Sequence, residues 1–286
     1  MKKIQQIIEL VRLDKPTGFL LLFRPCLWGL TLANYYNQNF KIFFLYIIFF
    51  FLGSVLMRSA GCIINDIVDR KFDKKVSRTK SRPIASGKVK IFEAVIYTSI
   101  LCFLALIVLI QFNVLTIKLG MASMVLAFTY PFMKRLTYWP QLFLGFTFNW
   151  GIIMAWSAIH SDLSITPFIL YVAAIFWTLG YDTIYGLQDL KDDEIIGLKS
   201  TSIKFQNNVK NFVTICYLLT ITFLIILTFF IDTNFFYFLT LMLIAYQFYL
   251  QIKNFNKNRP ETCLKAFKSN NYIGILVFIS LLTNYI

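Results

Sequence analysis

Long stretches without charge are the feature that most limits how this chain can fold. Residues 91–111 contain a single charged side chain, Glu93, and similar apolar stretches recur along the 286 residues. About 20 consecutive apolar residues are enough to cross the hydrocarbon of a lipid bilayer. Apolar residues make up 58% of the chain and charged residues 15%, which excludes a soluble enzyme and a disordered chain. The pattern therefore indicates a polytopic membrane protein.

The apolar stretches predict nine membrane-spanning helices and thus an all-α fold. The predicted spans are residues 17–36, 43–64, 91–111, 114–132, 142–159, 164–186, 212–231, 235–252 and 271–286. Residues 1–15 carry apolar side chains at helical spacing (Ile4, Ile7, Ile8 and Val11), which predicts an amphipathic helix on the membrane surface rather than a signal peptide. We expect residues 1–286 to form one transmembrane domain.

The basic residues set the expected topology. The net charge is +14, from 28 Lys and Arg against 14 Asp and Glu. In a soluble protein this excess would suggest a nucleic-acid partner, but cytoplasmic loops of membrane proteins retain Lys and Arg. With a cytoplasmic N-terminus, 26 of the 28 fall on the cytoplasmic side. We therefore predict a multi-pass protein in the lipid bilayer, no nucleic-acid partner, and a C-terminus outside. The first residues lack the Arg- and Ser-rich composition of a transit peptide, which favours a bacterial inner membrane.

Eight of the 14 acidic residues lie in two short segments, residues 65–73 and 182–194, each at the cytoplasmic end of a predicted span. In the first segment Asn65, Asp69 and Asp73 are four residues apart, so they share one face of a helix. The ordinary explanation is an acidic helix cap. Two such segments on the same side of the membrane favour a common binding site instead.

The second segment repeats the spacing of the first. Asp189 and Asp193 are four residues apart, and Asp182 lies seven residues before Asp189 on nearly the same face. Carboxylates at membrane depth are costly and usually functional. A divalent cation relieves their mutual repulsion, and Mg²⁺ is commonly held by carboxylates together with substrate phosphates. The single histidine, His160, and the absence of a CxxC pair disfavour a His- or Cys-based metal site.

A basic loop follows the first acidic segment, with nine Lys and Arg between residues 70 and 90. One explanation is a cytoplasmic loop that binds anionic lipid. Beside carboxylates that hold a metal ion, however, the same cations are suited to neutralise a diphosphate. No P-loop glycine pattern is present, so nucleotide hydrolysis is not supported.

These segments resemble the two signatures of the UbiA superfamily of intramembrane prenyltransferases. The first signature covers residues 58–87 and the second covers residues 180–201. Two further stretches, residues 14–28 and 130–156, resemble the branch of the family that acts on 4-hydroxybenzoate. The resemblance extends over roughly residues 10–210.

The resemblance implies nine transmembrane helices around a central cavity with a cytoplasmic cap, Mg²⁺ as cofactor, and a polyprenyl diphosphate donor. The implied catalytic residues are Asp69, Asp73, Asp189, Asp193 and Arg135. The implied metal ligands are Asn65, Asp66, Asp69, Asp182, Asp189 and Asp193. The implied substrate contacts are Arg24, Arg58, Arg78, Lys80, Arg82, Tyr130, Lys134 and Tyr185.

The implied reaction transfers a polyprenyl group to the ring carbon ortho to the hydroxyl of 4-hydroxybenzoate, in ubiquinone biosynthesis. The same metal site would serve homogentisate, a naphthoate or a porphyrin, and only the stretches around Arg24 and Lys134–Arg135 favour a carboxylated benzoate. An ion-coupled transporter is the non-enzyme alternative. Transporters commonly bind ions near the bilayer midplane, whereas these carboxylates gather at the ends of spans. A substrate assay separates the possibilities.

Overall fold

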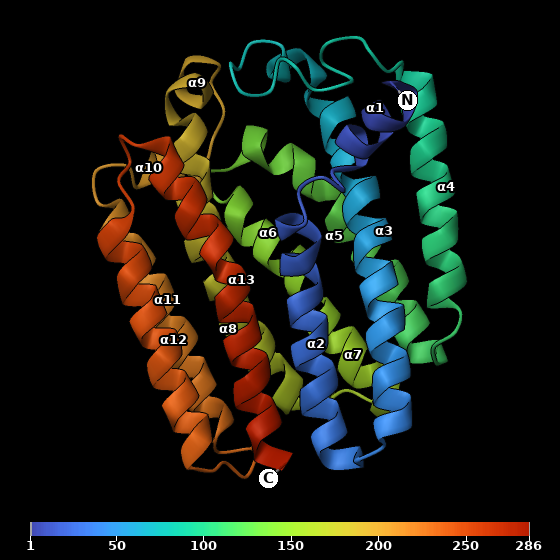
Figure 1. Cartoon of the computed structure of the whole chain (residues 1–286), viewed down its shortest axis with the longest axis vertical. Helices are drawn as coiled ribbons and strands as arrows, with labels where there is room; N and C mark the ends of the chain where they lie inside the picture. The colour runs from blue at the N-terminus through green and yellow to red at the C-terminus, as the bar shows by residue number, and fades with distance from the viewer. Residues whose placement is uncertain (1, 286) are drawn as a thin grey trace.

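The computed structural model describes residues 2–285 as a bundle of helices that run side by side along its long axis (Figure 1). Between these residues the chain forms α-helices, two short 3₁₀ helices and no strand, which confirms the predicted all-α class. The helices are α1 (Lys2–Val11), α2 (Thr17–Asn37), α3 (Phe40–Asp73), α4 (Ile91–Leu109), α5 (Val114–Leu136), α6 (Pro140–Asn149), α7 (Gly151–His160), α8 (Ile165–Gly186), η1 (Leu187–Asp189), α9 (Leu190–Ile195), α10 (Thr201–Lys204), α11 (Val209–Leu227), α12 (Phe235–Asn254), α13 (Pro260–Leu282) and η2 (Thr283–Tyr285).

The bundle is built to lie in a membrane. Eight stretches of the described chain are long and apolar enough to cross a bilayer. They are Phe40–Asp73, Ile91–Leu109, Val114–Leu136, Pro140–His160, Ile165–Ile195, Val209–Leu227, Phe235–Asn254 and Pro260–Tyr285. Helix α2 packs among them against α3, α7 and α13, and it is less apolar because it includes Arg24 and Pro25. The prediction of about nine long helices in a multi-pass membrane protein is therefore confirmed.

Asparagine side chains mark the starts of several long helices. Asn39 accepts a hydrogen bond from the backbone N–H of Ile42 at 3.2 Å, and Asn113 accepts one from Thr116 at 3.0 Å. The first N–H groups of a helix have no partner within the helix, so a side-chain oxygen at this position stabilises the start. These caps place the beginnings of α3 and α5 at short turns between spans.

One predicted span is interrupted. The prediction over residues 142–159 becomes α6 and α7, which are separated at Trp150. A Cβ on Gly151 would lie 2.3 Å from Cys26 Sγ of α2, so the chain approaches α2 closely at this point. The amide of Asn149 donates to the carbonyl of Ala174 in α8 at 3.1 Å. The break therefore lies where two neighbouring helices press against the segment.

The helix that contains the last predicted span, residues 271–286, begins earlier than that span. Helix α13 begins at Pro260. Its first turns contain Glu261, Lys265 and Lys268, so hydropathy does not mark them as part of a span. Cys263 and Asn270 on the same turns are buried, because tertiary contacts hold this polar stretch in the helix.

The amphipathic helix α1 packs on the protein as well as facing outward. Leu10 and Val11 are buried in a cluster with Ile63 of α3 and Val89. Ile4 and Ile8 are exposed, and they provide the apolar face that a membrane surface requires. The helix lies at the end of the bundle where the loop after α3 and helix α9 are found (Figure 1).

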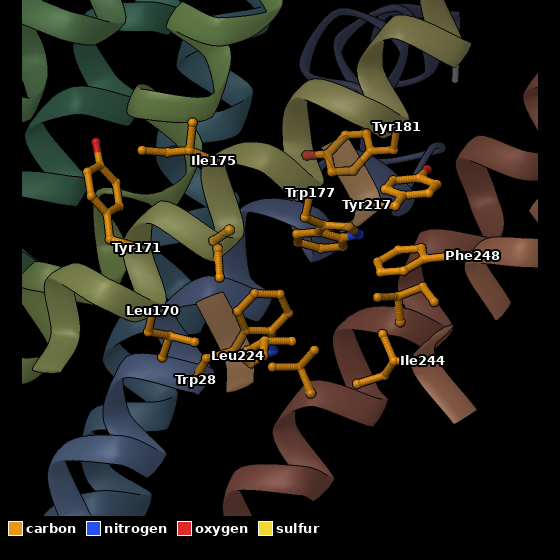
Figure 2. Packing of buried hydrophobic residues seen from close by; sticks show 14 of the residues in the cluster. Trp28, Leu170, Tyr171, Ile175, Trp177, Tyr181, Tyr217, Leu224, Ile244 and Phe248 are labelled. Carbon is orange, nitrogen blue, oxygen red and sulfur yellow. The ribbon is translucent and has the colours of Figure 1, made fainter. Parts of the chain in front are cut away.

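Helix α8 lies at the centre of the largest buried cluster (Figure 2). The rings of Trp28 and Trp177 lie 4.9 Å apart, and Trp177 donates to the side-chain oxygen of Asn270 at 2.8 Å. The Tyr217 hydroxyl donates to Gln251 at 2.7 Å. Aromatic packing combined with these hydrogen bonds ties α8 to α2 and α13, and it ties α11 to α12.

Candidate active site

An apolar cavity of about 430 Å³ lies between α2, α3, α4, α5, α6 and α7. It extends along α3 from Phe49 to Asn65, and 13 of its 29 lining residues are Phe, Met or Leu. Arg58, Asn65 and Tyr130 are the predicted site residues that line it. They lie toward the end of the bundle that carries residues 65–73 and 182–194, which we call the acidic end. The cavity thus joins an apolar compartment to a polar mouth.

Helix α3 carries the first acidic segment, because it continues beyond the predicted span to Asp73. Asp69 is buried and forms ion pairs with Lys134 and with Arg135, whose Nη2 lies 3.1 Å from Asp69 Oδ1. Both cations belong to the last turn of α5, and Arg135 also donates to the carbonyl of Val68 at 3.0 Å. The buried carboxylate therefore anchors the end of α5 to α3.

Two further carboxylates of α3 are held by arginines from outside the helix. Asp66 accepts from Arg12 at 2.5 Å and from Arg82 at 3.2 Å, and Arg82 also contacts Asp73 at 2.9 Å. The second carboxylate oxygen of Asp66 is buried and has no hydrogen-bond partner among the described residues. Arg82 thus lies between two carboxylates of the same segment.

Arg12 is a site residue that the sequence reasoning missed. It follows the amphipathic helix and lies outside both signatures, so spacing alone gave no signal for it. Burial disfavours its charge, but the attraction of Asp66 and its neighbours is greater and raises the pKa of Arg12. The N-terminal segment is thereby tied to the first acidic segment.

The second acidic segment continues α8 through η1 and α9. Asp189 forms an ion pair with Arg78, whose guanidinium also donates to the Tyr185 hydroxyl at 2.9 Å. Burial disfavours the charge of Arg78, but Asp189 and Tyr185 outweigh it and raise its pKa. The backbone N–H of Ser77 donates to Asp192 at 3.1 Å. These contacts attach the basic loop to the end of α8.

The two acidic segments, far apart in sequence, are brought to one place. Lys134 pairs with Asp69 of the first segment and interacts electrostatically with Asp193 of the second. Asp182 interacts with Arg58 in the same way. The two acidic segments therefore share a cation in this fold, and the binding role of their residues stays a prediction.

The donor atoms at the acidic end are suited to a hard cation such as Mg²⁺. They are carboxylate oxygens and the carboxamide of Asn65. Within residues 2–285, no three His, Cys, Asp or Glu side chains lie close enough together to hold one metal ion. The side chains of four of these carboxylates point toward Arg or Lys rather than toward one another: Asp66, Asp69, Asp73 and Asp189.

Two predicted contacts lie apart from this group. Arg24 does not line the cavity, and its side chain packs instead against Gly274 of α13, where a Cβ would lie 2.6 Å from Arg24 Cγ. Lys80 is exposed and forms no ion pair with any residue that the structure describes. Roles for both remain predictions.

The fold is shared with solved membrane proteins. A UbiA homolog from Aeropyrum pernix has a TM-score of 0.75 at 20% identity and covers 95% of this chain and 98% of its own. A UbiA homolog from Archaeoglobus fulgidus bound to GPP and Mg²⁺ has a TM-score of 0.70 at 15% identity and covers 97% of this chain and 99% of its own.

Curated relatives are more similar in sequence. The 4-hydroxybenzoate octaprenyltransferase of Psychromonas ingrahamii is 42% identical, and the match covers 100% of this chain and 98% of the relative. The mitochondrial 4-hydroxybenzoate polyprenyltransferase of Bos taurus is 41% identical, over 98% of this chain and 75% of the relative. The sequence model of the UbiA prenyltransferase family matches residues 22–282. This chain belongs to the UbiA prenyltransferase family.

Proposed function

We propose that this protein transfers a polyprenyl group from a polyprenyl diphosphate to the ring carbon ortho to the hydroxyl of 4-hydroxybenzoate, in ubiquinone biosynthesis. The observation that carries the proposal is the apolar cavity, which has Arg58, Asn65 and Tyr130 in its lining. Asn65 lies one helical turn before Asp69, whose carboxylate pairs with Lys134. Relatives that match nearly the whole chain are named for this reaction.

The donor would lie partly in the apolar cavity and partly at the acidic end. Its prenyl chain fits the Phe-, Met- and Leu-lined cavity, whose surface excludes water from a reactive carbon. Its diphosphate would be bound at the acidic end by Arg78 and Lys134, with Arg82 and Lys80 as further cations. Arg78 and Lys134 pair with Asp189 and Asp69 in this structure, so the same guanidinium and ammonium groups would transfer to phosphate oxygens.

Asn65, Asp69, Asp189 and Asp193 are the residues we expect to hold Mg²⁺. When bound, the metal would supply positive charge to the diphosphate oxygens and so favour departure of the leaving group. Asp66 and Asp73, with Asp182, would support the site: Asp66 and Asp73 fix the position of Arg82. The proposal for the metal rests on the donor atoms of this chain.

The chemistry breaks the bond between the allylic carbon and the diphosphate oxygen, and a new bond forms between that carbon and the acceptor ring. The aromatic face of Tyr130 lines the cavity and would stabilise positive charge on the allylic carbon. Tyr185 would orient Arg78 through their hydrogen bond. Arg135 would bind the acceptor carboxylate. The ring proton then passes to a nearby carboxylate or to the released diphosphate.

We also propose that the protein lies in a bacterial inner membrane with the acidic end toward the cytoplasm. The basic residues gather at that end, as cytoplasmic loops require. The termini lie at opposite ends of the bundle (Figure 1). A reporter enzyme that is active only outside the cytoplasm, fused to the C-terminus, should be active, whereas activity of a cytoplasmic reporter there would reverse the orientation.

The test of function uses membranes from cells that express the chain, together with labelled 4-hydroxybenzoate and a polyprenyl diphosphate. We expect a prenylated product with Mg²⁺ and none with EDTA. Parallel reactions receive homogentisate, a dihydroxynaphthoate or a porphyrin. Product from one of these and none from 4-hydroxybenzoate would keep the chemistry and overturn the acceptor. If the folded protein shows no metal-dependent transfer to any acceptor, the assignment of the chain as a prenyltransferase is overturned.

A further inference from the structure

A second pocket lies at the acidic end of the bundle, away from the cavity, between the α10–α11 connection and the α12–α13 connection. Its volume is about 510 Å³. It is lined by four cations, Lys210, Lys253, Lys257 and Arg259, together with several Asn and Gln residues and no carboxylate. None of the residues assigned to prenyl transfer lines it.

The walls of this basic pocket are held together. Lys257 Nζ donates to the carbonyl of Gln206 at 3.1 Å, which ties the loop between α12 and α13 to the loop before α11. Val209 and Phe255 are buried at its floor, and Lys210 lies 5.5 Å from the centre of the Phe255 ring. The cations therefore come from different segments that tertiary contacts fix around one concave site.

These cations lack partners of opposite charge. In the part of the chain that the structure describes, none of the four forms an ion pair. Glu261 is exposed and does not line the pocket, and Glu194 accepts instead from the side chain of Gln206 at 2.8 Å. The lining of the pocket therefore carries four cations and no carboxylate, and Glu194 and Glu261 lie beside it.

The helix ends add to this charge. Helices α11 and α13 both begin at the pocket, and neither N-cap, Asn208 nor Arg259, makes a side-chain capping bond. Helix N-termini carry partial positive charge and are stabilised by anions, whereas Lys210 in the first turn of α11 and Arg259 at the start of α13 are cations. The first turn of α13 contains Glu261, whereas the first turn of α11 contains no acidic residue, so an anion bound in the pocket would be stabilised mainly by the N-terminus of α11.

We propose that the basic pocket binds the phosphate of an anionic ligand, and that its position selects the headgroup of an anionic phospholipid. The pocket lies where α11 and α13 begin and α12 ends, which is the depth of lipid headgroups around a membrane protein. Basic pockets between transmembrane helices on the cytoplasmic side are suited to such headgroups. The proposal does not depend on the reaction that the cavity carries out.

The test measures binding of phosphatidylglycerol to the full chain in neutral detergent, by native mass spectrometry during a lipid titration. The variant carries Lys210→Gln, Lys253→Gln, Lys257→Gln and Arg259→Gln. The control carries Lys88→Gln, Lys90→Gln, Lys265→Gln and Lys268→Gln, which removes the same charge from exposed positions that line neither pocket. We expect at least about tenfold weaker binding in the first variant and about wild-type binding in the control.

Further arms identify the source of the phosphate. Phosphatidylcholine has no net charge and should not compete, whereas inorganic phosphate should compete only at high concentration. Inorganic phosphate that binds the pocket as tightly as the lipid would overturn the assignment to a lipid headgroup. An equal loss of lipid binding in both variants would overturn the assignment of the binding site to this pocket, because net charge alone would then explain binding. Thermal unfolding of both variants checks that each is folded.

Discussion

The helices around the cavity and the helices around α8 are built differently. In an 18-residue apolar window of Ile165–Ile195, 72% of residues are buried within the protein, against 6% in the corresponding window of Ile91–Leu109. Helix α8 is held by Trp177, Tyr217 and their polar partners, whereas α4 presents apolar side chains to the cavity and outward to the membrane. Each region nevertheless contributes to the acidic end, α3 from the cavity side and α8 from the packed side.

The difference teaches how a rigid site and an adaptable compartment coexist in one bundle. Dense packing together with the hydrogen bonds of Trp177 and Tyr217 holds α8, which carries Asp182 and leads into Asp189. The apolar cavity leaves space between helices that an apolar chain can occupy. The following predictions test this division, from the largest expected effect to the smallest.

Both regions should be equally necessary for the reaction. Asp69→Asn on α3 and Asp189→Asn at the end of α8 should each lower prenyl transfer by about 100-fold or more, because each removes a charge that the diphosphate site requires. The matched control is Asp232→Asn, whose carboxylate lies at the other end and accepts from Tyr35 at 3.1 Å. Full activity in either of the first two variants would mean that one segment alone suffices.

Replacing a glycine with alanine should change the stability of the protein differently in the two regions. A Cβ on Gly180 would lie 2.5 Å from a ring carbon of Tyr217, which is buried and stacked on Phe248 at 4.0 Å. Gly180→Ala should therefore destabilise the protein by about 1–3 kcal/mol. Gly53 lines the cavity with nothing within 4 Å of its Cβ position, so Gly53→Ala should leave stability unchanged or slightly higher. Thermal unfolding in detergent measures both, and a reversed order would contradict the contrast.

Filling the cavity should change donor choice more than stability. Gly53→Leu places a large side chain among the Phe and Met residues of the lining. We expect about tenfold lower kcat/KM with a long polyprenyl diphosphate and a smaller change with geranyl diphosphate, since only the long chain needs the occupied space. Asp69 and Asp189 are untouched, so metal dependence should persist. Equal losses with both donors would place the long chain elsewhere.

Removing one indole hydrogen bond should give the smallest effect. Trp177→Phe leaves the buried oxygen of Asn270 without its donor and should cost about 1 kcal/mol of stability. Trp150→Phe removes a bond to the carbonyl of Leu119 at 3.0 Å beside the cavity and should cost less, because the lining there relaxes more easily. Equal unfolding temperatures would indicate that the polar network around α8 contributes little to its rigidity.

The fold class and the two signatures could be predicted because they are local properties of the sequence. Apolar stretches define spans, and the spacing of Asp69 and Asp73 places them on one face. The break at Trp150 and the start of α13 at Pro260 could not, because they depend on Cys26, Ala174 and other residues distant in sequence. A hydropathy pattern contains no information about such neighbours.

The same distinction between local sequence patterns and contacts with distant residues applies to the site. The sequence indicated that Arg78 and Lys134 accompany the carboxylates, but not that each pairs with a particular one. Arg12 lies outside both signatures and reaches Asp66 only because α1 packs on α3. Arg24, by contrast, lies on α2 between Leu22 and Cys26, which line the cavity, yet it faces α13.

Four of the eight carboxylates at the acidic end, those of Asp66, Asp69, Asp73 and Asp189, form ion pairs with Arg or Lys, and this has a consequence for how the donor would arrive. On the proposed function, a diphosphate together with its metal ion replaces partners that are already present: the anion displaces carboxylates from Arg78 and Lys134, and the metal displaces those cations from Asp189 and Asp69. Binding is then an ion exchange within the protein, with little change in the total charge of the site. The KM for the donor should accordingly depend only weakly on ionic strength, unlike that of an enzyme that attracts its substrate into an unneutralised basic cleft.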